Sequence, residues 1–181
     1  MEQGYHTPVL LEESVGLLSV DPAGTYVDLT FGGGGHSRRI LSLLGPEGRL
    51  YGFDQDRDTL ANRPDDGRFH YVESNFRFLR AALRLRGVAQ VDGILADLGV
   101  SSHHFDAVER GFSFRGTALL DMRMNRRGGR TAADVVNTYD RDALTRVLGD
   151  WGELSTPWKV AGCIERARAA APITTTDALV A

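Results

Sequence analysis

Residues 26–37 read YVDLTFGGGGHS, an apolar run followed by four consecutive glycines and the start of an amphipathic stretch. This order is typical of a strand, a tight turn and a helix. Four glycines in a row cost backbone entropy, so a turn that serves structure alone rarely uses so many. They are useful where a ligand lies against the main chain at a helix N-terminus. Asp54 ends the next apolar run, where its carboxylate can accept hydrogen bonds from ribose hydroxyls, and we therefore predict a nucleoside-cofactor site.

The spacing of the glycines limits which cofactor fits. A dinucleotide fingerprint needs glycines at G-x-G-x-x-G, but in the two frames available Ser37 or Arg38 stands where the third glycine belongs. The lysine of a phosphate-binding P-loop is also missing, because Lys159 is the only lysine in the chain. Asp28, which precedes the glycines, suits a cationic amino-acid group better than a pyrophosphate. These features predict S-adenosylmethionine as the cofactor; the alternative is a purely structural turn with a solvated Asp28.

Strand and helix patterns alternate through the first half of the chain. Strands are expected at 25–31, 49–54, 68–73 and 91–98, with helical stretches between them. Such alternation indicates an α/β fold with a parallel, doubly wound sheet. Beyond residue 106 we expect only helices, at 132–137, 141–148 and 157–170. The sequence thus predicts two domains, residues 1–105 and residues 106–181, and both are expected to be incomplete because the chain stops at the start of a further helix.

Composition narrows the class of protein. Hydrophobic residues make up 42% of the 181 residues, the net charge is -3, and no apolar run has the length of a membrane span. The N-terminus lacks the layout of a signal peptide, and a single cysteine excludes an internal disulfide and a cysteine-built metal site. We expect a cytoplasmic protein with no metal and no membrane contact. A dense arginine group that includes Arg123 is either a phosphate-contacting patch or a solvated loop.

Six motifs follow one another along the chain: HTPVLLEE at 6–13, DLTFGGGGHS at 28–37, DQD at 54–56, DLGVSS at 97–102, RGFSF at 110–114 and LDMRM at 120–124. Together they resemble the family of bacterial ribosomal RNA small-subunit methyltransferase H, also called MraW. The resemblance implies S-adenosylmethionine-dependent N4-methylation of a cytidine in the decoding region of small-subunit (16S) ribosomal RNA. It also implies a Rossmann-like class I methyltransferase sheet in the order 3-2-1-4, with an inserted helical domain that recognises RNA, each only partly contained in this chain.

The resemblance implies cofactor contacts in the first domain. Gly34, Gly35 and His36 would line the amino-acid part of S-adenosylmethionine, with backbone amides near its carboxylate. Asp54 would hold the ribose, and Phe76 would flank the adenine. Gly34, Gly35, His36 and Asp54 lie within the quoted motifs.

Further positions concern the methyl-transfer step. Asp97 would lie by the methyl donor. Either Asp97 or a nearby backbone carbonyl is our candidate acceptor for an N–H of the cytosine amine, whose lone pair is delocalised into the ring. His104 stands where the family usually has glutamine, and as a hydrogen-bond donor it would contact the cofactor there. Phe112 and Phe114 are hypothesised to support the flipped base, although two phenylalanines at this spacing are also typical of a core. Arg123 is the candidate contact to RNA.

Three functions remain open on the sequence. The first is an active methyltransferase whose partner is small-subunit ribosomal RNA or the assembled subunit. The second is a truncated remnant that binds cofactor or RNA without turnover, and the third, disfavoured by the glycine spacing, is a nucleotide-dependent oxidoreductase. The fourth strand would be a bare, apolar sheet edge, which favours association and makes a homodimer an expected assembly.

Overall fold

A computed structural model describes residues 8–100 and 102–181. The chain divides into two compact units, Met1–Ser101 and Ser102–Ala181, and each is described by itself below. None of the helices within the described ranges combines the length and apolar character that crossing a membrane requires.

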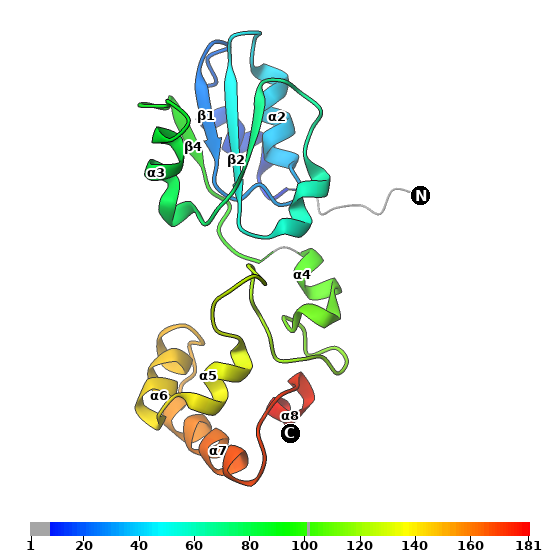
Figure 1. Ribbon diagram of the computed structural model, residues 1–181, viewed down its shortest axis with the longest axis vertical. Coiled ribbons are helices and arrows are strands. Elements are labelled where there is room, and N and C mark those ends of the chain that lie inside the picture. The colour runs from blue at the N-terminus through cyan, green and yellow to red at the C-terminus, as the bar shows by residue number, and fades with distance from the viewer. Residues whose placement is uncertain (1–7, 101) are drawn as a thin grey trace. The chain divides into compact units, whose positions relative to one another are not determined.

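Unit 1 contains a four-stranded parallel sheet with the order β3-β2-β1-β4 (Figure 1). Its elements are α1 (Leu11–Leu17), β1 (Thr25–Asp28), α2 (Gly35–Leu43), β2 (Arg49–Asp54), the 3-10 helix η1 (Arg57–Asn62), β3 (Phe69–Glu73), the 3-10 helix η2 (Phe76–Phe78), α3 (Leu79–Arg84) and β4 (Gly93–Leu95). The strand order and the parallel pairing confirm the predicted Rossmann-like α/β sheet.

Side chains alternate between the two faces of this sheet, and each face has its own core. On one face Tyr26 and Leu50 pack with Ile40 of α2. On the other face Val27 packs with Leu83 of α3. The sheet therefore has helices on both sides (Figure 1), as is usual for parallel sheets.

Two strands are shorter than the sequence predicted. The first, expected at 25–31, ends at Asp28, and the fourth, expected at 91–98, is limited to Gly93–Leu95. Beyond β4 the chain bonds to another group: the Asp97 amide donates to the Thr30 hydroxyl at 2.8 Å rather than to a neighbouring strand. Beyond β1 only scattered bonds to the neighbouring strands continue, such as that from the Phe31 amide to the Phe53 carbonyl at 3.0 Å. The prediction that Asp97 ends the fourth strand is therefore wrong, since it lies in the segment that follows.

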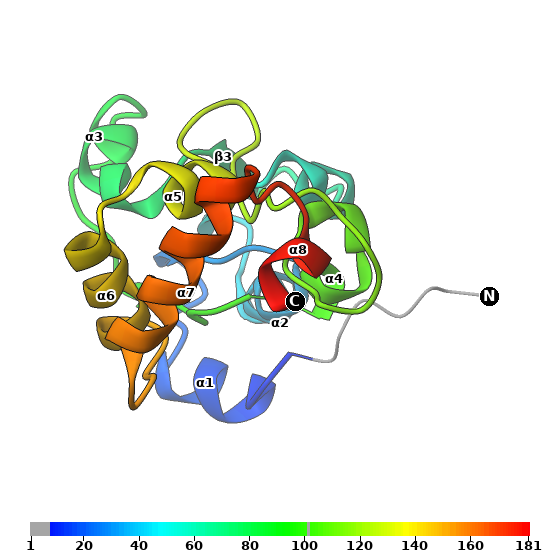
Figure 2. The same cartoon turned by 90° about the horizontal axis from the view of Figure 1, so that it is seen from below.

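Unit 2 has helices, an irregular segment at 111–131 and, in place of a sheet among its described residues, one isolated bridge between Leu119 and Thr175. Its elements are α4 (Ser102–Asp106), the 3-10 helix η3 (Val108–Arg110), α5 (Ala132–Thr138), α6 (Arg141–Asp150), α7 (Pro157–Ala170) and α8 (Thr176–Val180). Figure 2 shows α6 beside α7, and Leu144 and Ile164 of these helices share one core. The helices expected at 132–137, 141–148 and 157–170 are confirmed to within two residues, whereas α4 was not predicted.

Candidate cofactor and substrate sites

The carboxylate of Asp54 links the end of β2 to the glycine loop. Its Oδ2 accepts a hydrogen bond from the Gly32 amide at 2.9 Å, and its Oδ1 accepts one from the Asp56 amide at 2.8 Å. A carboxylate has about four acceptor positions, so Asp54 can accept more hydrogen bonds than these two. Asp54 is thus fixed in orientation at the carboxyl end of the sheet, where α/β folds bind ligands.

Two side chains hold the carbonyl groups of the same loop. Asn62 donates from Nδ2 to the Gly32 carbonyl at 2.9 Å, and Arg38 donates from Nη1 to the Gly33 carbonyl at 2.7 Å. Arg38 also donates from Nη2 to the main-chain carbonyl of Asn62 at 2.8 Å. This bond links the two residues into one clamp around the loop. Neither residue was identified from the sequence, because their spacing from the loop follows no motif that would single them out.

The glycine loop ends at the N-terminus of α2. Gly34 is the N-cap with φ of 75°, a left-handed conformation that favours glycine. A Cβ at Gly34 would come within 2.9 Å of the Phe31 ring, and one at Gly35 within 2.1 Å of Pro8 Cγ. The first-turn amides of a helix have no partner within it, and they carry the positive end of the helix dipole. Both glycines are therefore required by close packing against Phe31 and Pro8, and their predicted contact with the cofactor carboxylate stays a prediction.

His36 lies in this first turn, but its ring is used elsewhere. The side chain is buried, and Nε2 lies 3.2 Å from the Val9 carbonyl oxygen. The ring therefore fastens the segment before α1 onto α2. The predicted cofactor contact of His36 is therefore one through its backbone amide. The family resemblance also implies a contact through backbone amides.

Asp28 lies beneath the glycine loop and is 1% exposed. Its Oδ2 accepts a hydrogen bond from the Ser37 hydroxyl at 2.7 Å and its Oδ1 accepts one from the Thr30 amide at 3.1 Å. Burial raises the pKa of this carboxyl above its ordinary value, against the lowering effect of the Ser37 hydroxyl. The interpretation of Asp28 as a solvated or ligand-facing carboxylate is wrong, because both oxygens hold the loop in shape.

Three predicted residues lie at the carboxyl ends of three different strands. Asp54 ends β2, Phe76 opens η2 after β3, and Asp97 follows β4. The position of Phe76 is set by Asn75, which caps η2 and donates from Nδ2 to Gln55 Oε1 at 2.8 Å. Phe76 is 42% exposed and Asp97 is exposed, so both side chains are accessible to a ligand at the carboxyl end of the sheet.

The predicted residues of unit 2 differ in how firmly they are held. His104 is buried, and its ring packs edge to face against that of Phe112 at 5.2 Å between centroids. Phe112 is partly buried, which favours the core interpretation for this residue. Phe114, two residues later, is 81% exposed. Of the two phenylalanines, only Phe114 therefore offers an open ring.

Arg123 is held in place by an acidic neighbour and a buried arginine. Its Nε donates to Asp121 Oδ1 at 2.7 Å, and this contact lowers the pKa of the Asp121 carboxyl. Arg110, 2% exposed, donates from Nη2 to the carbonyl groups of Arg123 and Met124 at 3.1 and 3.2 Å. Arg110 therefore organises the segment that carries Arg123. A fully buried arginine is unusual, and no pattern in the sequence indicated that this one would be buried.

Comparisons with known proteins give one matching family model and several similar sequences. The model of the MraW methylase family matches residues 3–181. The chain is 58% identical to the ribosomal RNA small subunit methyltransferase H of Bacteroides fragilis over 174 residues, which are 96% of this chain and 57% of that protein. It is 54% identical to the protein of the same name from Flavobacterium johnsoniae over 175 residues, or 97% of this chain and 58% of the relative. The chain thus spans a little over half the length of these relatives.

Proposed function

Because the chain belongs to the MraW methylase family, we propose that it binds S-adenosylmethionine and takes part in N4-methylation of a cytidine in the decoding region of small-subunit (16S) ribosomal RNA. One observation carries the cofactor assignment: Asp54 is bonded to the Gly32 amide of a glycine loop that leads straight into a helix N-terminus. This arrangement supports the proposal, because a carboxylate that could accept from ribose hydroxyls lies next to a helix N-terminus whose amides suit a carboxylate, and S-adenosylmethionine carries both a ribose and a carboxylate.

Each part of the cofactor has a counterpart in unit 1. Amides of the first turn of α2 would receive its carboxylate, Asp54 would accept from the ribose hydroxyls, and Phe76 would lie against the adenine. Bound in this way, the cofactor supplies the methyl group for transfer. The loop is held from both sides by hydrogen bonds, so little reorganisation is needed on binding, which favours affinity.

The chemical step requires the cytosine amine to be oriented toward the methyl group. Asp97 is proposed to accept an N–H hydrogen bond from that amine, which offsets the positive charge that develops on nitrogen. The Asp97 backbone is fixed by the Thr30 hydroxyl, while its side chain is exposed. His104 is proposed to support the cofactor in place of the glutamine usual in the family.

Residues 106–181 are proposed to recognise the RNA, in the free ribosomal RNA or the assembled small subunit in the cytoplasm. Phe114 offers an exposed ring on which a base can stack. Arg123, already oriented by Asp121, offers a guanidinium for a phosphate. A homodimer is a further proposal, since β4 pairs with β1 alone in the described sheet and leaves an edge that another chain can use.

Calorimetry with S-adenosylmethionine tests the cofactor assignment, and transfer of a labelled methyl group to small-subunit particles tests the reaction. Binding with transfer to a cytidine N4 is the expected result. Binding without transfer supports the alternative, a chain that retains cofactor or RNA affinity but does not turn over. A folded chain that binds neither cofactor nor RNA contradicts both proposals.

A further inference from the structure

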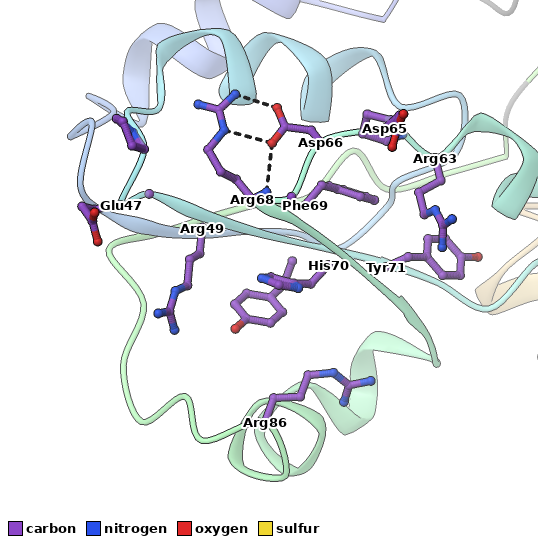
Figure 3. A pocket seen from close by; sticks show the side chains of 15 residues that line it. Glu47, Arg49, Arg63, Asp65, Asp66, Arg68, Phe69, His70, Tyr71 and Arg86 are labelled. Atoms are coloured by element: carbon purple, nitrogen blue, oxygen red, sulfur yellow. Dashed lines mark hydrogen bonds and ion pairs between the residues drawn. The ribbon is translucent and has the colours of Figure 1, made fainter.

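Unit 1 has a hollow at the amino end of its strands, away from the residues assigned to the cofactor. It has a volume of about 940 Å³ and runs along β3, the edge strand of the sheet (Figure 3). The start of β2, the turn at 63–68 and Arg86 just beyond α3 line it. None of the predicted cofactor or substrate residues lines this hollow.

Three basic residues line this hollow on one side of the sheet. Arg49 and Tyr51 are two apart on β2 and therefore share a face, and the sheet register pairs Tyr51 with His70 of β3. Arg86, just beyond the helix that covers this face, also lines the hollow, and its Nη1 donates to the Ala82 carbonyl at 2.8 Å. Figure 3 shows Arg49, His70 and Arg86 on the same side of the β2 and β3 ribbons.

The carboxylates nearby do not neutralise these arginines. Asp66 is bound by Arg68 at 2.6 Å, which lowers the pKa of Asp66 to about 2, and this pair lies on the other side of the two strands (Figure 3). Glu47 and Asp65 also line the hollow. Within the described residues, neither forms an ion pair with Arg49 or Arg86.

His70 lies in the electric field of the two arginines. Its ring stacks on Tyr51 at 4.9 Å between centroids. Burial lowers the pKa of His70 first, and the positive charges of Arg49 and Arg86 lower it further. At neutral pH the imidazole is therefore an uncharged hydrogen-bonding group between two cations, and an anion placed among the three would offset the effect of the arginines.

We propose that Arg49, His70 and Arg86 bind a backbone phosphate of the RNA at a contact separate from the methyl-transfer site. The proposal rests on the RNA substrate of the proposed function. Phosphate contacts supply much of the affinity of proteins for nucleic acids, and arginine binds phosphate through two parallel hydrogen bonds. The hollow along the edge strand β3 is open, which suits an extended single strand of RNA. A ribosomal RNA is also large enough to reach both the amino end of the strands, where the hollow lies, and the carboxyl end, where the cofactor is proposed to bind.

The test compares two double variants with the same change in charge. Arg49→Ala/Arg86→Ala removes the arginines of the hollow, whereas Arg80→Ala/Arg84→Ala removes two arginines of α3 that lie outside it. Fluorescence anisotropy with a labelled single-stranded RNA of decoding-region sequence measures affinity over a series of salt concentrations. S-adenosylmethionine binding, measured in parallel, checks that both variants remain folded.

The hollow variant is expected to bind RNA about tenfold more weakly, and its salt dependence should be shallower by about 0.7 logarithmic units for each phosphate that is no longer bound. The control variant should change the affinity by much less, and cofactor binding should change in neither. Equal losses in the two variants would overturn the phosphate site while leaving the proposed function intact. If the unaltered chain binds cofactor but no RNA, the RNA part of the proposed function fails and the phosphate site with it.

Discussion

The glycine loop of unit 1 and the segment 110–124 of unit 2 are both predicted to contact ligands, but they are built differently. In the loop, main-chain groups of Gly32 and Gly33 are bonded to Asp54, Asn62 and Arg38. In the segment 110–124, Arg110 likewise holds the backbone. The group predicted to contact the ligand there is a side chain, the exposed ring of Phe114. A small cofactor can be bound by fixed main-chain groups, whereas a large RNA is contacted by side chains on the surface.

The largest expected effect concerns the carboxylate that joins β2 to the loop. Asp54→Ala removes the acceptor for the ribose and for the Gly32 and Asp56 amides. Each hydrogen bond to a charged group contributes about 1.5–3 kcal/mol, so S-adenosylmethionine affinity should fall about a hundredfold. Calorimetry measures this, with Asp65→Ala as a control outside the site. An unchanged dissociation constant would remove Asp54 from the site.

A smaller loss of affinity is expected from the loop backbone. Gly34→Ala introduces a Cβ 2.9 Å from the Phe31 ring at a φ of 75°, a conformation that costs an L-residue about 1–2 kcal/mol. We expect about tenfold weaker cofactor binding together with a lower melting temperature. Gly67→Ala is the matched control, because nothing lies within 4 Å of its Cβ position. Equal behaviour of the two variants would mean that the loop is not shaped by its glycines.

The RNA side of the comparison is sharpened by the two phenylalanines. Phe114→Ala should weaken RNA binding about fivefold to tenfold, since base stacking contributes about 1–3 kcal/mol, and it should leave stability unchanged because the ring is exposed. Phe112→Ala should instead lower the free energy of unfolding by about 1–2 kcal/mol, since its ring packs against His104. Anisotropy and urea unfolding separate the two effects. Loss of RNA affinity only in the Phe112 variant would reverse their assignment.

Removing one hydrogen bond of the clamp should have a more modest effect. Asn62→Ala removes the donor to the Gly32 carbonyl, and a single neutral hydrogen bond contributes about 1 kcal/mol. We expect about fivefold weaker S-adenosylmethionine binding and unaltered RNA binding. A fall in RNA affinity without a change in cofactor affinity would break the distinction between the two regions.

The smallest effect is a change with pH. Since the folded state raises the pKa of Asp28, it keeps the proton to higher pH than the unfolded chain, and stability falls as pH rises from near 3.8 through the folded value. Asp28→Asn removes this titration, so its stability relative to the unaltered chain should rise across that window and then level off. Asp66→Asn is a control with the opposite sign, because the pKa of Asp66 is lowered to about 2. The free energy of unfolding of the unaltered chain should therefore exceed that of Asp66→Asn above pH 3.8, and this difference should shrink as the pH falls from 3.8 toward 2. Urea unfolding at several pH values measures both; a constant difference for Asp28→Asn would contradict the buried carboxylate.

Much of the fold could be predicted because local patterns determine it. The strand at 49–54 and the helix at 157–170 have the bounds that their apolar patterns indicated. The short fourth strand could not be predicted, because its end depends on the bond between the Asp97 amide and Thr30, which are far apart in the chain. The burial of Asp28 likewise depends on Ser37 in the helix above it.

The amino-acid sequence alone indicated the fold class and the family, and it predicted S-adenosylmethionine rather than a dinucleotide, since motifs, glycine spacing and apolar periodicity are local properties of the chain. Only the tertiary structure decided which groups hold the loop, which of Phe112 and Phe114 is open, and that Arg49, His70 and Arg86 share one hollow. The physical reason is that hydrogen bonds, burial and electric fields act across space between segments that no motif connects. Residues 26–37 specify the turn, and residues as distant as Asn62 fix its shape.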